Sequence, residues 1–148
     1  MHLSQRGLYA LKALIHLTEA YDQGLVKIHA IAEAESIPEK FLEGILVTLK
    51  NARVVASQRG REGGYRLRRP PQEIQVGDVV RVIDGPLAPF GDAVELAHRV
   101  KTETRHAGLF DLLLEVRNAS AAILDNTSLD DLMSRNRRLL ARGGRPGQ

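Results

Sequence analysis

The chain of 148 residues contains no cysteine. This absence excludes disulfide bonds, and it excludes every metal centre or iron–sulfur cluster that is held by thiolates. Tryptophan is also absent and aromatic residues make up only 4% of the chain, so we expect no stacking platform for single-stranded nucleic acid. The sequence has no hydrophobic run of the ~20 residues that cross a bilayer, and no signal peptide precedes the first predicted helix. We therefore expect a cytoplasmic protein without a membrane partner or a cofactor.

Positive charge slightly exceeds negative charge, with a formal net charge of +3 and a pI near 9.5. This balance suits a phosphate-bearing partner but does not require one. The length fits one domain with an appended helix. We do not expect an enzyme, because no serine or lysine lies beside a histidine in a recognisable nucleophile arrangement. The Gly-rich REGG stretch also lacks the Lys-Ser/Thr ending of a P-loop.

The most informative stretch is residues 36–69, which begins with a helix signal. Ser36 and Glu39 have the spacing of a capping box, and Pro38 stands in the first turn, where its missing N–H costs nothing. Apolar residues then recur at helical spacing: Phe41, Leu42, Ile45, Leu46 and Leu49. This pattern predicts a helix over residues 36–51.

A short β-ribbon is predicted directly after this helix. Residues 54–57 and 65–67 are rich in strand-forming side chains, and QRGREGG lies between them. Its glycines, at positions 60, 63 and 64, permit the positive φ angles of a hairpin loop, with Arg59 and Arg61 at the tip. A helix followed by an arginine-tipped ribbon indicates a winged helix-turn-helix. The helix fits the major groove of DNA and an arginine on a thin loop fits the minor groove. The alternative is that these arginines form only a solvated edge.

The remaining helices complete the predicted organisation. A first helix over residues 1–21 has Ser4 as its N-cap, and Arg6 near its start either meets a phosphate or is solvated. A short helix over residues 29–35 precedes the residue 36–51 helix and completes a helix-turn-helix. Further on, a helix starts near Val76 and ends at Gly85. Residues 86–108 are the least readable part, with a short helix over 92–100 and a polar loop over 102–106.

Residues 109–124 predict a helix with a wide apolar stripe. We expect this stripe to pack against the same helix of a second chain across a two-fold axis, or alternatively against the first helix of its own chain. The predicted interface residues are Leu109, Leu112, Leu113, Val116, Ala119 and Ile123. A last short helix follows Ser128, and the Gly/Pro-rich end is expected to be disordered.

The predicted fold class is mainly α with a small β-ribbon, namely a winged helix-turn-helix domain plus a long C-terminal dimerisation helix. The predicted parts are a DNA-binding domain over residues 1–85, a linker or sensor loop over 86–108, dimerisation helices over 109–140 and a disordered tail over 141–148.

Five segments together resemble the Rrf2 family of bacterial transcription regulators, and they cover nearly the whole chain. They read LSQRGLYALKAL (3–14), IHAIAEAESIPEKFLEGIL (28–46), RGREGGYRL (59–67), PPQEIQVGDVVRVIDGP (70–86) and VRNASAAILDNTSLDDL (116–132). The resemblance implies a homodimer on a roughly palindromic operator in double-stranded DNA. Arg59 matches the minor-groove arginine of the family, and Lys40 and Glu43 fall where side chains reach bases. The predicted DNA-binding residues are Arg6, Ser36, Glu39, Lys40, Glu43, Arg59, Gly60, Arg61, Gly63, Gly64 and Tyr65.

One departure from the family matters for sensing. Many members carry three cysteines that bind an iron–sulfur cluster in the interval that corresponds to residues 86–108, and here that interval has none. Cluster sensing is therefore not transferred to this chain. The interval keeps Asp92, His98, Glu103 and His106, which are candidate Zn²⁺ or Fe²⁺ ligands at loose spacing, so no metal site is predicted.

The leading hypothesis is a dimeric, sequence-specific DNA-binding regulator, a repressor without a cluster and with an unknown effector. One alternative is a regulator gated by a metal or small ligand through His98 and His106. Another is a protein–protein adaptor whose winged domain has lost its affinity for DNA.

Overall fold

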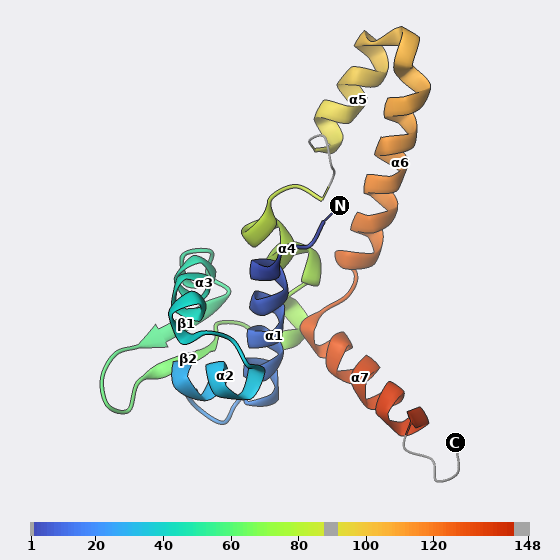
Figure 1. The fold of residues 1–148 in the computed structure, drawn as a ribbon. Coiled ribbons are helices and arrows are strands. Elements are labelled where there is room, and N and C mark those ends of the chain that lie inside the picture. Colours follow the sequence, from blue (N-terminus) through green and yellow to red (C-terminus); the bar gives the residue numbers. More distant parts are fainter. Residues whose placement is uncertain (1, 88–91, 144–148) are drawn as a thin grey trace.

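The computed structural model describes residues 2–87 and 92–143 (Figure 1). The elements are α1 (Gln5–Glu19), α2 (Ile28–Glu35), α3 (Glu39–Asn51), β1 (Val55–Gln58), β2 (Gly64–Leu67), a 3-10 turn (Pro71–Glu73), α4 (Val76–Asp84), α5 (Ala93–Thr102), a second 3-10 turn (Thr104–His106), α6 (Ala107–Leu124) and α7 (Leu129–Gly143). Helices α1 to α4 and the ribbon form a compact winged domain. Helices α5 and α6 extend from it as an antiparallel arm, and α7 projects in another direction. The predicted mainly helical fold with a small β-ribbon is confirmed.

The core of the winged domain is built around α1 and α3. Four of the five apolar residues predicted to line α3 are fully buried, namely Leu42, Ile45, Leu46 and Leu49, and they pack with Leu14, Leu17 and Ile31. Phe41 is the exception, because it is 45% exposed and meets the ring of Tyr9 edge-on at 5.6 Å. Phe41 therefore lies at the border of the apolar stripe and not within it.

The predicted capping box at Ser36 is wrong. Ser36 ends α2 in the left-handed conformation, with φ 53° and ψ 45°, and the amide of Ile37 reaches back to the carbonyl of Ala32 at 3.0 Å. Helix α3 begins three residues later at Glu39, after Pro38, and no side chain caps it. An N-cap residue needs an extended backbone, which Ser36 cannot adopt while it closes the tight turn between α2 and α3.

The ribbon forms one residue later than predicted at its first strand. Strands β1 and β2 are antiparallel, with Val55 opposite Leu67 and Gln58 opposite Gly64. Val26, from the α1–α2 connection, pairs with Tyr65 through two backbone hydrogen bonds of 2.8 Å and so attaches the ribbon to the helical body. Gly60 has φ 107°, as a hairpin glycine should. Gly63 serves close packing instead, since a Cβ there would collide with the carbonyl of Gln58 and the backbone of Arg59.

The C-terminal half differs from prediction at several boundaries, including the start of α6, which is Ala107 and not residue 109. Helix α5 begins at Ala93, and the segment predicted as a polar loop contains the second 3-10 turn, Thr104–His106. Helix α7 is 15 residues long and runs to Gly143, so residues 141–143 are helical and do not belong to a tail. The other residues of the predicted tail, 144–148, lie outside the described residues. None of the described helices has the length and apolar character that would let it cross a membrane.

Candidate nucleic-acid interface

The outward side of α3 is the first part of the candidate interface. Burial of its leucines and isoleucine against the core leaves Lys40 and Glu43 exposed near the start of the helix. Gly44 has open space around it and Val47 is exposed, so the middle of this side is apolar and carries no long side chain. Such a surface suits close approach to base edges, where an apolar side chain can meet a thymine methyl group.

The wing, which consists of β1, β2 and the loop between them (residues 59–63), borders the same surface. A concavity of about 460 Å³ lies between the start of α2, the second half of α3 and the ribbon. Three cationic side chains line it: Lys27, Lys50 and Arg59. The ammonium group of Lys27 donates a 2.6 Å hydrogen bond to the carbonyl of Arg61, which ties the wing tip to the start of α2. A positively lined space between an exposed helix and a β-ribbon has the charge that attracts the phosphate backbone of DNA.

The sequence interpretation did not include Lys27, Val47 or Lys50 among the site residues. The signal that could have found them was their helical spacing from Lys40 and Glu43, and for Lys27 its place at the start of α2.

Other predicted site residues take supporting positions. Arg6 in α1 donates from Nη2 to the hydroxyl of Thr48 in α3 at 2.7 Å. Glu39 lies 3.4 Å from Nδ1 of His29, at the mouth of the turn where Ser36 is exposed. Tyr65 is half-buried and its backbone pairs with Val26, so it anchors the ribbon.

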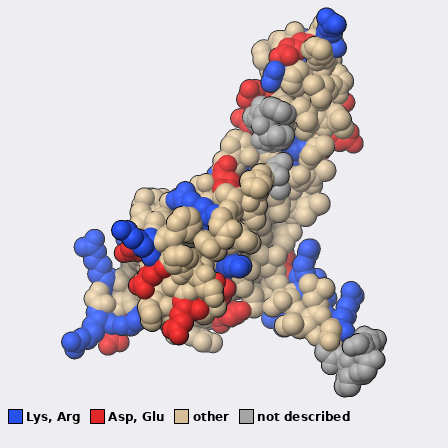
Figure 2. Space-filling model, in the orientation of Figure 1, with Lys and Arg blue, Asp and Glu red and all other residues tan. Residues whose placement is uncertain are grey.

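Lys and Arg side chains gather on the wing side of the molecule (Figure 2). A second basic group lies on α7, with Arg135, Arg137, Arg138 and Arg142.

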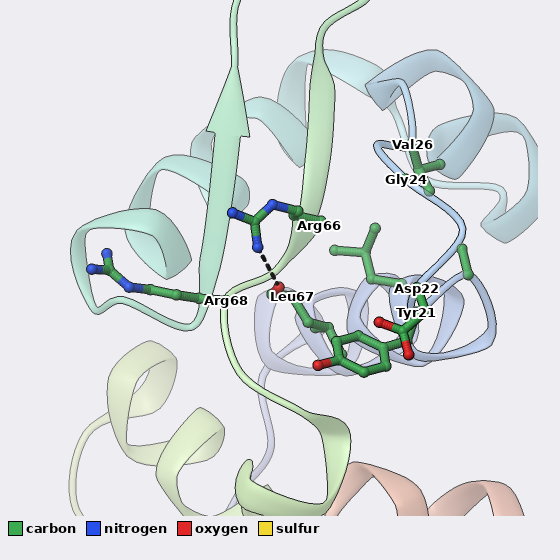
Figure 3. A pocket seen from close by; sticks show the side chains of 9 residues that line it. Tyr21, Asp22, Gly24, Val26, Arg66, Leu67 and Arg68 are labelled. Atoms are coloured by element: carbon green, nitrogen blue, oxygen red, sulfur yellow. Dashed lines mark hydrogen bonds between the residues drawn. The ribbon is translucent and has the colours of Figure 1, made fainter.

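A smaller cavity of about 190 Å³ lies near the base of the ribbon, between Tyr21, Asp22, Arg66 and Arg68. Figure 3 shows both arginines directed away from Tyr21 and Asp22, and Arg66 donates to the carbonyl of Leu67. Its charged groups do not converge on a common point, so we assign no ligand to this cavity.

Helix α6 carries the residues predicted for a dimer interface. Leu109, Leu112, Val116 and Ile123 are each about half or more exposed, and Ala119 is exposed between them. Leu113 is half-buried. On its inner side α6 packs against α5, where Phe110 is buried and the guanidinium of Arg99 lies 4.1 Å from its ring centre.

The four candidate metal ligands do not come together. The carboxylate of Asp92 caps α5 by accepting from the amide of Glu95 at 2.9 Å, and that of Glu103 accepts from Nε of Arg99 at 2.8 Å. His98 and His106 are exposed. Within residues 2–87 and 92–143, no group of three or more His, Cys, Asp or Glu side chains could hold a metal ion.

A helix-turn-helix with an exposed second helix beside a basic β-ribbon defines a winged helix-turn-helix DNA-binding protein. A family model described as Rrf2, an iron-dependent transcriptional regulator, matches residues 3–135. The chain belongs to the Rrf2 family. It is therefore a transcriptional regulator with DNA as its partner, and the predicted absence of an enzymatic function is confirmed.

Relatives and solved structures agree with this assignment. The HTH-type transcriptional regulator CymR of Bacillus subtilis is 34% identical over 134 residues, which span 90% of this chain and 91% of CymR. Rv1287 of Mycobacterium tuberculosis, also named for an HTH-type regulator, is 39% identical over 134 residues, 89% of this chain and 81% of its own. The structure of CymR, the global cysteine regulator of B. subtilis, has a TM-score of 0.74 at 32% identity, covering 91% of this chain and 98% of that one. T. potens IscR has a TM-score of 0.70 at 29% identity, with 92% and 88% covered.

Proposed function

We propose that this chain is a homodimeric, sequence-specific repressor that binds a roughly palindromic operator and works without an iron–sulfur cluster. The observation that carries the proposal is the basic concavity between α3 and the wing, which Lys50 and Arg59 line, on the same helix that exposes Lys40 and Glu43 near its start. Two winged domains of this kind on one duplex give the affinity and the length of DNA site that a regulator needs.

Each side chain has a role that suits its position. Glu43 accepts a hydrogen bond from cytosine N4, and Lys40 donates to guanine O6 or N7 in the major groove. Arg59 enters the minor groove, where A·T-rich sequence concentrates negative potential. Gly60, Gly63 and Gly64 keep the wing thin enough to approach the DNA. Arg6 and Arg61 lie where phosphates pass, with Ser36 and Glu39 at the front of α3.

The exposed stripe on α6 supports the dimer. From Leu109 to Ile123 it extends over about 21 Å of helix. A continuous apolar surface of this length is a typical interaction site, and a two-fold axis brings the same stripe of two copies together. Leu113 borders the stripe on the side of α5. A dimer spread over a promoter excludes other proteins from it, which is the simplest route to repression.

Work without a cluster is supported by the donor chemistry. Iron–sulfur clusters need thiolates, and this chain has no cysteine. In the arm, the carboxylates of Asp92 and Glu103 are already engaged by protein donors. We place the regulator in the cytoplasm, because that is where a bacterial chromosome lies.

The test begins with selection of bound duplexes from a random-sequence library by the full-length protein. Binding of the enriched operator is then compared for wild type, Arg59→Ala, Glu43→Ala and the control Arg105→Ala, which removes the same charge at the exposed tip of the arm. We expect Arg59→Ala to cost about 1–3 kcal/mol of binding free energy and Arg105→Ala less than about 0.5 kcal/mol. Glu43→Ala should relax the preference at a cytosine. Failure to enrich any sequence, or a monomer in sedimentation at micromolar concentration, would refute the proposal.

A further inference from the structure

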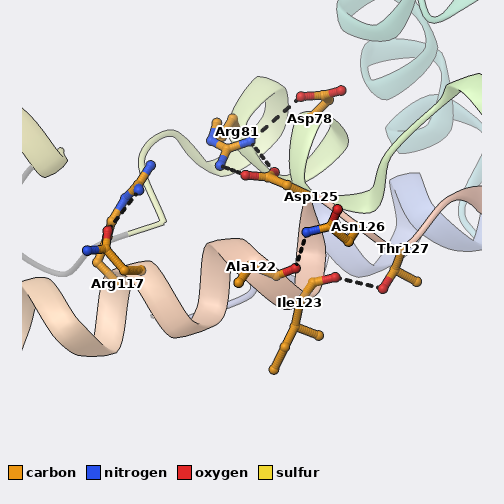
Figure 4. Close-up of polar contacts among 9 residues, drawn as sticks. Asp78, Arg81, Arg117, Ala122, Ile123, Asp125, Asn126 and Thr127 are labelled. Atoms are coloured by element: carbon orange, nitrogen blue, oxygen red, sulfur yellow. Dashed lines mark hydrogen bonds and ion pairs between the residues drawn. The ribbon is translucent and has the colours of Figure 1, made fainter.

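One of the contacts between the arm and the winged domain is an arginine–carboxylate pair, beside the backbone hydrogen bond from Val76 to Thr127. Asp125 directly follows the end of α6, and both of its carboxylate oxygens accept from Arg81 in α4, from Nη1 at 2.7 Å and Nη2 at 2.8 Å (Figure 4). Asp78 adds a second carboxylate 3.6 Å from Nη1. Two parallel bonds from one guanidinium fix the relative orientation of both groups as well as their distance.

Asp125 is held in a place that α4 leaves open for it. A Cβ at Gly77 would collide with the same carboxylate, so the absence of a side chain at this position lets Asp125 approach the helix. The residues that follow Asp125 are also attached to the end of α6. The side chains of Asn126 and Thr127 bond back to the carbonyls of Ala122 and Ile123 at 2.6 and 2.7 Å, which ties the turn to the helix end (Figure 4).

The other end of α4 is attached by a second carboxylate to Ser4, the residue that precedes α1. One carboxylate oxygen of Asp84 accepts from the amide of Ser4 at 3.0 Å and the other accepts from the Ser4 hydroxyl. That hydroxyl in turn caps α1 by accepting from the amide of Gly7 at 2.9 Å. Helix α4 is therefore fixed by one carboxylate to the DNA-reading body and by another to the arm.

We propose that the Arg81–Asp125 pair is the positioning element that sets the distance between the two half-sites that the dimer accepts. This inference rests on the proposed dimeric, DNA-binding function. Helix α6 is 18 residues long, or about 27 Å. A rotation of about 7° at the base of such a rod displaces its far end by about 3.4 Å, the rise of one base pair. A joint that holds the operator spacing must therefore be stiff in angle, which a bidentate pair provides and a single contact does not.

The exposure of the pair favours orientation over stabilisation as its role. The side chains of Arg81 and Asp125 are 31% and 38% exposed, so solvent screens their attraction and the pair adds little to the stability of the fold. Nevertheless the hydrogen bond from Arg81 lowers the pKa of Asp125, and the bond to Asp125 raises the pKa of Arg81. Both groups therefore stay charged and paired at neutral pH.

The experiment measures the affinity of the full-length protein for a series of operators. Half-sites recovered by selection are separated by spacers that differ one base pair at a time. Arg81→Lys keeps the positive charge but cannot make two parallel hydrogen bonds to Asp125. Gly77→Ala displaces the Asp125 carboxylate and leaves both charges intact. The matched control is Glu103→Gln, whose carboxylate also accepts from an arginine at 2.8 Å, but locally, at the C-terminal end of α5.

Wild type and Glu103→Gln should bind the operator with the best spacer about 10-fold or more tightly than operators with neighbouring spacers. The reason is that a wrong spacer misplaces base contacts, and the loss of one such contact lowers the affinity by about this factor. Arg81→Lys and Gly77→Ala should reduce this preference to about 2-fold, with dimerisation unchanged in sedimentation and affinity for the best operator reduced by less than about 5-fold. Combining Arg81→Asp with Asp125→Arg should restore part of the preference that each single change removes.

The inference is overturned if Arg81→Lys and Gly77→Ala keep the sharp wild-type optimum. A uniform loss of affinity at every spacer, with the optimum still narrow, would also overturn it, because that outcome marks a merely stabilising pair. A wild-type protein that binds without any spacer preference, or as a monomer, would instead refute the proposed dimeric function.

Discussion

The guanidinium of Arg6 reaches from α1 to α3, where its Nη2 donates a 2.7 Å hydrogen bond to the hydroxyl of Thr48. That hydroxyl also donates to the carbonyl of Gly44 one turn earlier, at 3.1 Å. The contact ties the first turn of α1 to the second half of α3. The contact lies outside the buried apolar core.

We expect removal of the Arg6–Thr48 bond to have a small and non-additive effect on stability. Thr48→Val and Arg6→Met should each lower the free energy of unfolding by about 1 kcal/mol, since each deletes one partner of a partly exposed hydrogen bond. The double variant should lose clearly less than the sum of the two, because both changes remove the same bond. Urea unfolding measures all three, and Thr102→Val, which loses a hydroxyl that donates to the His98 carbonyl one turn earlier, serves as the control. Strict additivity would mean that the two side chains do not interact.

Gly63→Ala should damage the wing and leave the helices intact. The added Cβ collides with the backbone at Gln58 and Arg59, so the loop has to open and Arg59 loses its position. We expect a loss of DNA affinity close to that of Arg59→Ala, about 1–3 kcal/mol, with an unchanged far-ultraviolet circular dichroism spectrum. Gly108→Ala is the matched control, because nothing lies near a Cβ at that position. Equal DNA affinity of the two variants would contradict the role of Gly63.

Val116→Glu should convert the proposed dimer to a monomer. The side chain is 49% exposed in the single chain, at the centre of the stripe that runs along α6, and a pair of carboxylates placed face to face across a two-fold axis repel and lose their hydration. Analytical ultracentrifugation should show the change at micromolar concentration. Val94→Glu places the same charge on an exposed valine of α5, outside the stripe, and should leave the dimer intact. A dimeric Val116→Glu protein would exclude α6 as the interface.

Acid should weaken the attachment at both ends of the 125–131 segment. The hydrogen bond from Arg81 lowers the pKa of Asp125, and the bond from the Ser128 amide lowers the pKa of Asp131, both below the ordinary value of 3.8. A depressed carboxyl pKa adds stability that is fully present above the unfolded pKa and is lost as the pH falls through the folded one. Unfolding free energies between roughly pH 6 and pH 3 should therefore fall toward the acid end, and fall less steeply for Asp131→Asn. An unchanged slope in Asp131→Asn would contradict the assignment.

Much of the winged domain could be predicted because its signals are local. The leucine and isoleucine spacing located α3 and its end at Asn51, the glycines located the wing, and Val76 was identified as the start of α4. The capping box shows the limit of such signals. Ser36 and Glu39 have the right spacing, yet a reciprocal cap forms instead at Ser128 and Asp131, where each backbone amide donates to the other side chain at 2.9 and 3.0 Å. Whether a serine begins one helix or ends the previous one depends on how tightly the two helices pack.

The amino-acid sequence by itself determined the class of protein. Apolar periodicity and glycines in a short loop are local features, and they predicted a winged helix-turn-helix. The lack of cysteine is a property of the composition, and it excluded thiolate ligands. Only the tertiary structure decided how the reader is attached. The partners Arg81 and Asp125 are 44 positions apart and Ser4 and Asp84 are 80 apart. No local pattern marks such pairs, because their meeting depends on the angles at which whole helices cross.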